Sequence, residues 1–281
     1  MNMDMKKSAS HRRRTKIIAT LGPGTDDPLV MEGLIRCGVD VFRLNMSHGS
    51  QEEQTQRARL VRDTARKLRW QVALLVDLQG PKIRVENFRE GGVDLQGGDH
   101  FTLDSEDVTT PGDDRRVGVS YKNLPNDVKP GDVLLLDDGL ISMQVQLVEG
   151  GQVHCLVENG GRLMNRKGLN LQGGGLSVSG LADDDLPHIE LAAELGADYV
   201  AVSFVSEAQD IDRARELLRK VGSEAALVAK IERMEAIDNL EEICDTADVI
   251  MVARGDLGVE IGDEELPGLQ KQIIRTAIRH N

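Results

Sequence analysis

The sequence has few cysteines, and their positions exclude a fold built on disulfides. Cys37, Cys155 and Cys244 are odd in number, lie far apart and form no C-x-x-C spacing. This pattern argues against both a disulfide scaffold and a zinc site, and it fits the reducing environment of the cytoplasm. We therefore expect a cytoplasmic protein.

Long hydrophobic runs are also missing. No run approaches the ~18 apolar residues of a membrane span, so we expect no membrane partner. The N-terminal stretch MNMDMKKSASHRRRTK is basic, but no apolar region follows it, which argues against a secretory signal. We interpret residues 1–12 as a disordered tail.

Positive charge is in deficit. Lys and Arg total 34 against 47 Asp and Glu in 281 residues, which gives a net charge of −13. Such an acidic chain is a poor candidate for nucleic-acid binding, although it can still gather positive charge in a pocket. The length suits one large domain or two ordinary ones, with ample material for a core.

What the sequence does contain is a rhythm of apolar, β-branched runs and helical patterns. The expected strands are 15–22, 39–45, 71–79, 198–204, 225–232 and 248–255. The expected helices are 27–38, 50–69, 183–196, 206–222, 234–247 and 263–281. This α/β alternation predicts a parallel sheet with crossover helices.

Residues 82–179 break that rhythm. They read as short alternating runs separated by turn sequences such as PGD, DDG and EGG. Such a sequence pattern is typical of β-hairpins, so we expect a small all-β domain over 82–179. The main domain is then discontinuous and consists of residues 13–81 and 180–281.

Two architectures fit the alternation: a doubly wound open sheet and a (β/α)8 barrel. The first strand–helix turn, TLGPGTDDP, lacks both the G-x-G-x-x-G pattern and a P-loop Lys-Ser/Thr. A barrel gathers its chemistry at the C-terminal ends of many strands. Four strand ends here carry candidate residues, namely Arg43 and Asn45, Asp77, Lys230 and Glu232, and Gly255 and Asp256. We therefore favour the barrel.

The residue types at these ends suit phosphoryl transfer. Glu232 and Asp256 could share a hard cation such as Mg²⁺, while Arg43 and Lys230 supply positive charge. Each residue also has a structural interpretation: Lys230 with Glu232 as a salt bridge, Asp256 as a helix cap, and Asp77 as a hydrogen-bond acceptor. Their common location favours the catalytic interpretation.

Several stretches of the chain resemble pyruvate kinase in order and spacing. They are RRTKIIATLGP, VFRLNMSHGS, DLQGPKIRV, LLLDDGLI, KGLNL, VAKIER and MVARGDLGVEIG. The resemblance runs from about Arg13 to the last residue, and the motifs DLQGPKIR and NRKGLN are similar to the bacterial form. It implies a (β/α)8 TIM barrel interrupted by a mobile β lid. The implied reaction converts phosphoenolpyruvate and ADP to pyruvate and ATP.

The resemblance also implies roles at the reaction centre. Arg43 would contact the transferring phosphate, and Lys230 would stabilise its charge in flight. Glu232 and Asp256 would hold Mg²⁺ (or Mn²⁺). The backbone N–H groups around Gly255 and Asp256 would bind the substrate carboxylate, as a helix start can do for any anion.

For the nucleotide, the resemblance implies contacts from Asn45, Arg84 and Lys167. Lys167 lies in the expected lid, so lid closure would complete the site and expel water.

A monovalent cation site is implied too. Asn45, Ser47 and Asp77 match side-chain ligands for K⁺, with the carbonyl of Leu78 beside them. Many members of the family have Glu where this chain has Lys82. Because an ammonium group can replace the K⁺ charge, we expect turnover without added K⁺.

The sequence departs from the family pattern at its end. The family continues with two more barrel strands and a C-terminal domain that carries the effector site and part of the homotetramer contact. We expect six of eight strand–helix units, with the first and sixth strands as edges. Our interpretation is a truncated gene, a frameshifted product or a partial record. Two alternatives stay open: an impaired remnant that only binds ligand or a full-length partner, and a Mg²⁺-dependent lyase or aldolase that forms an enolate.

Overall fold

The computed structural model describes residues 13–178, 180–182 and 185–280, and the tail expected at residues 1–12 lies outside them. The chain divides into two compact units. The first unit contains the chain up to Gly80 together with Ala182–Ser203 and Asp212–Val228. The second contains Pro81–Leu181, Phe204–Ile211 and the chain from Ala229 onward.

The first unit is built on parallel strands, as the alternating pattern predicts. In order of pairing they are β1 (Ile18–Thr20), β2 (Val41–Asn45), β3 (Ala73–Asp77) and β12 (Tyr199–Val202). Phe42 and Leu44 of β2 are fully buried, and side chains alternate across a strand. Arg43 and Asn45 therefore share the other face of β2.

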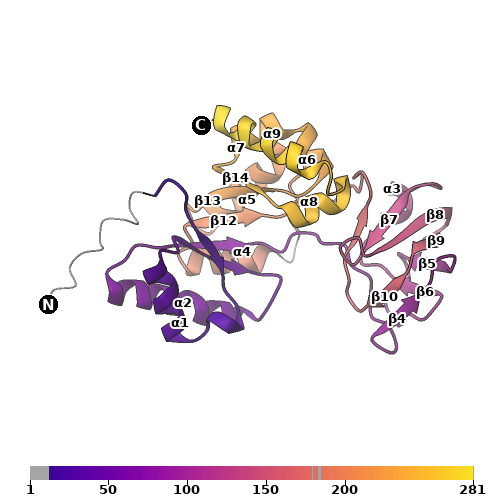
Figure 1. Ribbon diagram of the computed structural model, residues 1–281, viewed down its shortest axis with the longest axis horizontal. Helices are drawn as coiled ribbons and strands as arrows, with labels where there is room; N and C mark the ends of the chain where they lie inside the picture. Colours follow the sequence, from indigo (N-terminus) through magenta and orange to yellow (C-terminus); the bar gives the residue numbers. More distant parts are fainter. Residues whose placement is uncertain (1–12, 179, 183–184, 281) are drawn as a thin grey trace. The chain divides into compact units, whose positions relative to one another are not determined.

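Helices follow the strands of this unit, and their ends are specified locally. They are α1 (Pro28–Cys37), α2 (Gln51–Leu68), α4 (Leu186–Glu194) and the larger part of α5 (Ala208–Lys220), from Asp212 onward. Asp27 caps α1 by accepting the N–H of Leu29 at 2.7 Å. Gly38 ends α1 in the left-handed region at φ +94°, where glycine has no Cβ to strain. Figure 1 shows α1 and α2 side by side.

The second unit contains the predicted hairpin module, drawn in magenta and pink in Figure 1. Its strands are β4 (Gly92–Leu95), β5 (His100–Asp104), β6 (Arg116–Gly118), β7 (Val133–Leu136), β8 (Ile141–Glu149), β9 (Gln152–Asn159), β10 (Gly161–Met164) and β11 (Leu169–Leu171). Six of them form a sheet in the order β11-β7-β8-β9-β5-β6, and β10 pairs with β4. Adjacent pairs are antiparallel except β5 with β6. One short helix, α3 (Leu124–Asp127), interrupts the β pattern.

The rest of the second unit returns to strand–helix alternation. Its elements are the end of β13 (Ala226–Ile231), α6 (Met234–Asp238), α7 (Leu240–Thr246), β14 (Val249–Val252), α8 (Arg254–Ile261) and α9 (Leu266–Arg279). The strand order of the main sheet is β1-β2-β3-β12-β13-β14. β1 and β14 are therefore its end strands among the described residues, as expected for the first and sixth strands.

Two element predictions near the C-terminus were wrong. The helix expected at 234–247 is divided at Asn239 into α6 and α7. The Asn239 side chain donates to the carbonyl of Ser206 at 2.9 Å, a tertiary contact at the point of division. The strand expected at 248–255 ends at Val252, and α8 begins at Arg254. Gly255 and Gly258 made α8 hard to predict, because glycine is a poor helix former. Burial of Leu257 outweighs this low helix propensity.

Within the described ranges, the structure has no helix that is both long and apolar enough to cross a membrane.

Candidate active site

In the first unit, Arg43 and Asp77 form a charge pair at the ends of β2 and β3. The Arg43 guanidinium donates from Nε and Nη2 to Asp77 Oδ2 at 2.6 and 2.5 Å, and from Nη1 to Thr20 Oγ1 at 2.9 Å. Asp77 is buried, whereas the Arg43 side chain keeps 26% of its surface exposed. The guanidinium of this pair is therefore partly accessible to solvent, whereas the carboxylate is not.

The other members of the predicted K⁺ site lie around the same strand ends. Asn45 and Asp77 are partners in the β2–β3 register, and Asn45 Oδ1 accepts the N–H of Ser47 at 3.1 Å. The carbonyl of Leu78 accepts the hydroxyl of Ser203 at 2.8 Å. The first unit thus brings Asn45, Ser47 and Asp77 together, with oxygen atoms of the kind that K⁺ prefers.

In the second unit, the end of β13 carries a buried ion pair. Lys230 Nζ lies 2.8 Å from Glu232 Oε1, and the two side chains are 11% and 1% exposed. The other oxygen, Oε2, accepts the N–H of Phe204 at 2.7 Å. Burial raises the pKa of Glu232, and the nearby charge of Asp256 raises it further, while Lys230 lowers it. Both carboxylate oxygens of Glu232 are therefore fixed in direction.

Asp256 lies in the first turn of α8, beside Lys82. Lys82 Nζ lies 3.4 Å from Asp256 Oδ1 and 3.8 Å from Asp138 Oδ1. A cavity of about 640 Å³ is lined by these three residues together with Gly255 and Arg254. The N–H groups of the first turn of α8 have no side-chain cap, so this helix start is available to an anion.

Glu232 and Asp256 fit a divalent cation. The charge of Asp256 raises the pKa of Glu232, and a cation bound by both carboxylates would relieve that repulsion. The part of the chain that the structure describes has no group of three or more His, Cys, Asp or Glu side chains arranged as ligands. Mg²⁺ is commonly bound by one or two carboxylates, with water and substrate oxygens completing its shell, so two are sufficient.

The predicted nucleotide contacts of the second unit lie on neighbouring backbone segments. Arg84 forms an isolated bridge with Gly168 and donates to the carbonyl of Arg166 at 2.8 Å. Lys167 Nζ lies 2.7 Å from Asp137 Oδ1. Burial lowers the pKa of Arg84, with the charge of Arg166 as the second cause. Arg84, Arg166 and Lys167 thus come from two backbone segments that pair with each other.

Sequence reasoning missed several residues that shape these groups. Phe204 holds Glu232 from a left-handed backbone conformation, φ +55°, which is rare for a bulky residue and marks local strain. Asp137 and Asp138 also have positive φ, at 51° and 56°. The DDG turn signal could have identified these two aspartates, because Asp is tolerated there. Nothing in the sequence singles out Phe204.

Comparisons with known proteins connect these residues to one family. A family model described as "Pyruvate kinase, barrel domain" matches residues 12–281. Pyruvate kinase II of Salmonella typhimurium is 51% identical over 272 residues, which cover 96% of this chain and 57% of that protein. The pyruvate kinase of Staphylococcus aureus is 40% identical over 265 residues, 94% of this chain and 45% of its own length.

A solved structure agrees. The crystal structure of a pyruvate kinase from Cryptosporidium parvum matches with a TM-score of 0.89 at 31% identity, covering 95% of this chain and 56% of that chain. The chain therefore spans about half the length of the relatives that it matches.

Proposed function

This chain belongs to the pyruvate kinase family, and from that premise we propose that it serves phosphoryl transfer from phosphoenolpyruvate to ADP, giving pyruvate and ATP. The observation that carries the proposal is the buried Lys230–Glu232 pair at the end of β13, in a unit that also contains Asp256. Parallel α/β folds gather reacting groups at that end of their strands.

The proposed reaction breaks the bond between phosphorus and the enol oxygen and forms a bond to an oxygen of ADP. Negative charge is spread over the phosphoryl oxygens during transfer, and the enolate that is left takes up a proton at carbon to become pyruvate. Arg43 and Lys230 supply fixed positive charge to these oxygens. Lys230 is held in place by Glu232, so its charge needs little reorganisation during the step.

Glu232 and Asp256 would hold Mg²⁺, or Mn²⁺ in its place, which supplies the positive charge that neutralises and orients the phosphoryl oxygens. Contacts within the chain orient Glu232 before any metal ion binds. Lys230 and the N–H of Phe204 each fix one oxygen of Glu232. The N–H groups at Gly255 and Asp256, in a helix start without a side-chain cap, would bind the substrate carboxylate.

The nucleotide would be bound by Arg84 and Lys167 of the β module, with Asn45. In this proposal residues 82–179 act as a lid on a discontinuous barrel domain, 13–81 and 180–281. Asn45, Ser47 and Asp77 would be the ligands of a monovalent cation, and the ammonium group of Lys82 would replace the charge of K⁺. The proposed partners are phosphoenolpyruvate and ADP or ATP, in the cytoplasm, with no nucleic acid or membrane.

A coupled assay for pyruvate tests this function. We expect the 281-residue chain to form pyruvate only when phosphoenolpyruvate, ADP and Mg²⁺ are all present. Lys230→Met should lower the rate by about 10²–10³-fold, the usual effect of removing one preorganised charge. The matched control is Lys220→Met, because Lys220 is an exposed lysine at the end of α5.

Each other outcome of this assay would indicate a different function for the chain. Binding of phosphoenolpyruvate without turnover by the wild-type chain would indicate a remnant that only binds ligand. Pyruvate release from a larger carbon acid, without ADP, would indicate a lyase. A wild-type rate no higher than that of Lys230→Met would contradict phosphoryl transfer by this chain.

A further inference from the structure

The segment that leaves the β module, Gly173–Val178, is held by polar contacts from several elements. Its three glycines, Gly173, Gly174 and Gly175, have φ values of +83°, +78° and +106°. A run of glycines in these conformations is a flexible connection by composition. The polar contacts therefore have to supply the order that the backbone lacks.

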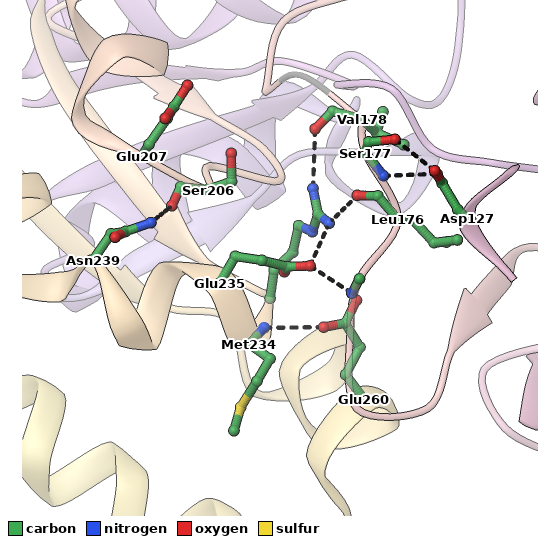
Figure 2. A network of polar contacts seen from close by, with 12 residues as sticks. Asp127, Leu176, Ser177, Val178, Ser206, Glu207, Met234, Glu235, Asn239 and Glu260 are labelled. Atoms are coloured by element: carbon green, nitrogen blue, oxygen red, sulfur yellow. Dashed lines mark hydrogen bonds and ion pairs between the residues drawn. The ribbon is translucent and has the colours of Figure 1, made fainter. Parts of the chain in front are cut away.

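Three of these contacts come from the start of α6. Arg233 donates from Nη1 to the carbonyl of Val178 at 3.0 Å and from Nη2 to the carbonyl of Leu176 at 2.5 Å. The same Nη2 donates to Glu235 Oε1 at 2.9 Å, and that oxygen also accepts the N–H of Gly175 at 2.6 Å. Figure 2 shows the carbonyls of Leu176 and Val178 facing this cluster, with Glu235 beside them.

Further contacts fasten the segment and the start of α6 on both sides. The carbonyl of Glu260 accepts the N–H of Gly173 at 3.0 Å, and its carboxylate accepts the N–H of Met234 at 3.0 Å (Figure 2). On the β module, Asp127 accepts both the N–H and the hydroxyl of Ser177, at 2.8 and 2.7 Å. The segment is thus tied to α3, α6 and α8 within one unit.

Arg233 directly follows Glu232, and this adjacency gives the contacts a consequence for the reaction centre. The backbone of Arg233 is extended, at φ −128° and ψ 155°, so consecutive side chains point to opposite sides. On one side Glu232 is held by Lys230 and Phe204; on the other side Arg233 holds the glycine-rich segment. Arg233 is only 4% exposed, so water does not compete for its donors.

We propose that Arg233 is a positioning residue whose grip on the Leu176 and Val178 carbonyls keeps Glu232 in the place set by Lys230 and Phe204. Movement of the connecting segment would then reach Glu232 through two bonded residues of one backbone. This inference rests on the proposed function only in giving Glu232 a metal ion to bind.

Two amide protons report the two sides of Arg233 without any ligand. The N–H of Gly175 donates to Glu235, and the N–H of Phe204 donates to Glu232. Their hydrogen-exchange rates can be followed by NMR in the ¹⁵N-labelled 281-residue chain. In Arg233→Gln we expect both rates to rise by about tenfold or more, the scale expected when hydrogen bonds to charged groups are lost.

A matched control is Arg116→Gln. Arg116 also pairs with carboxylates inside the second unit, Asp104 and Asp107, but it has no contact with the connecting segment in the structure. We expect this variant to leave both exchange rates at the wild-type value. Should Arg233→Gln fail to fold, Arg233→Lys keeps the charge beside Glu235 without the two-pronged donor, and both rates should still rise, by a smaller factor.

Faster exchange at Gly175 alone would overturn the proposal, because Arg233 would then fasten only its own segment. No change at either amide would overturn it as well. A Mn²⁺ titration adds a second readout: affinity should fall in Arg233→Gln and stay constant in Arg116→Gln. A wild-type chain that binds no Mn²⁺ would contradict the proposed function, whereas the two exchange rates would still decide the role of Arg233.

Discussion

At the scale of single residues, Glu260 is a buried carboxyl whose pKa lies near neutral pH. It is 5% exposed, and burial raises the pKa of its carboxyl from 4.5 to about 7. The N–H of Met234 lowers this pKa, Glu235 raises it, and Arg233 and the Asn170 side chain lower it. Since burial is the largest cause, the folded protein holds a proton here that the unfolded chain would release.

This shift predicts a specific dependence of stability on pH. Below pH 4.5 the group is protonated in both states; as pH rises toward 7, only the unfolded chain gains by ionising. The contribution of Glu260 to the free energy of unfolding should therefore fall by on the order of 3 kcal/mol between about pH 4.5 and pH 7. Glu260→Gln should remove that fall, as measured by urea unfolding at several pH values.

The comparison between variants isolates this one group, because many other carboxyls titrate over the same range. Glu264→Gln is the control, since Glu264 is an exposed carboxylate of the same region. Its stability should follow the wild type at every pH. Parallel curves for wild type and Glu260→Gln would show that Glu260 ionises freely in the folded protein.

Lys82 offers a second test at this scale. Its ammonium lies 3.4 Å from Asp256 and 3.8 Å from Asp138, so it brings a fixed positive charge to the cavity at the start of α8. We expect Lys82→Glu to remove that charge and make pyruvate formation depend on added K⁺, while wild type works without it. Lys129→Glu, at an exposed lysine, controls for the change in net charge.

The readout is the ratio of rates with and without K⁺ in each variant. Wild type that is nearly inactive until K⁺ is supplied, together with an unchanged ratio in Lys82→Glu, would contradict this role for Lys82.

At the scale of elements, helices with local end signals were predictable. Asp27 and Gly38 delimit α1, and Ser50 with Glu53 begins α2, close to the expected ranges. The helices that were missed or merged lack such signals. α8 begins at Arg254 without a side-chain cap, and Asn239 separates α6 from α7 through a contact with Ser206, which lies 33 positions away in sequence. Tertiary contacts of this kind leave no local trace.

The capping box of α2 supports a prediction for that element. Ser50 Oγ accepts the N–H of Glu53 at 3.3 Å, and Glu53 Oε2 accepts the N–H of Ser50 at 2.8 Å. Ser50→Ala should lower the free energy of unfolding by about 1 kcal/mol, because one N–H of the first turn loses its partner. Ser50→Asp keeps a capping oxygen and should retain most of the stability. Equal thermal unfolding of Ser50→Ala and wild type would show that the cap contributes nothing.

Strand alternation was enough to predict that Lys230 and Glu232 lie side by side. Lys230 lies on β13 and Glu232 directly follows the strand, two positions along an extended backbone, so the sequence already puts them on one face, and the structure joins them at 2.8 Å. Phe204 and Arg233 could not be found in the same way. One acts through a backbone N–H in a left-handed conformation, and the other through contacts with carbonyls more than 50 positions away. Periodicity carries no information on either.

At the scale of the whole molecule, the strand order follows the chain. β1, β2 and β3 are consecutive neighbours, and β12, β13 and β14 continue the order after the β module. Sequential strands are usually adjacent in space, and helices connect β1 to β2, β2 to β3, β12 to β13 and β13 to β14, so the sequence pattern was enough to predict the parallel arrangement. The β module and α4 lie between β3 and β12. The partner of an end strand is a different matter, since no strand in the described residues pairs with the outer side of β1.

That outer side of β1 predicts self-association. Ile17 and Ile18 are 42% and 48% exposed, beside backbone groups that can pair with another strand. Ile18→Lys should weaken concentration-dependent association, because a charge on an edge strand opposes strand addition and costs little when it remains in water. Sedimentation velocity over a range of concentrations measures this association.

Leu29→Lys is the control: Leu29 is 78% exposed but lies on α1, where no backbone edge is available. Equal weakening by both substitutions would mean that exposed apolar area drives the association, and a monomer at all concentrations would mean that the β1 edge attracts no partner; only a selective effect of Ile18→Lys identifies the strand edge itself as the contact.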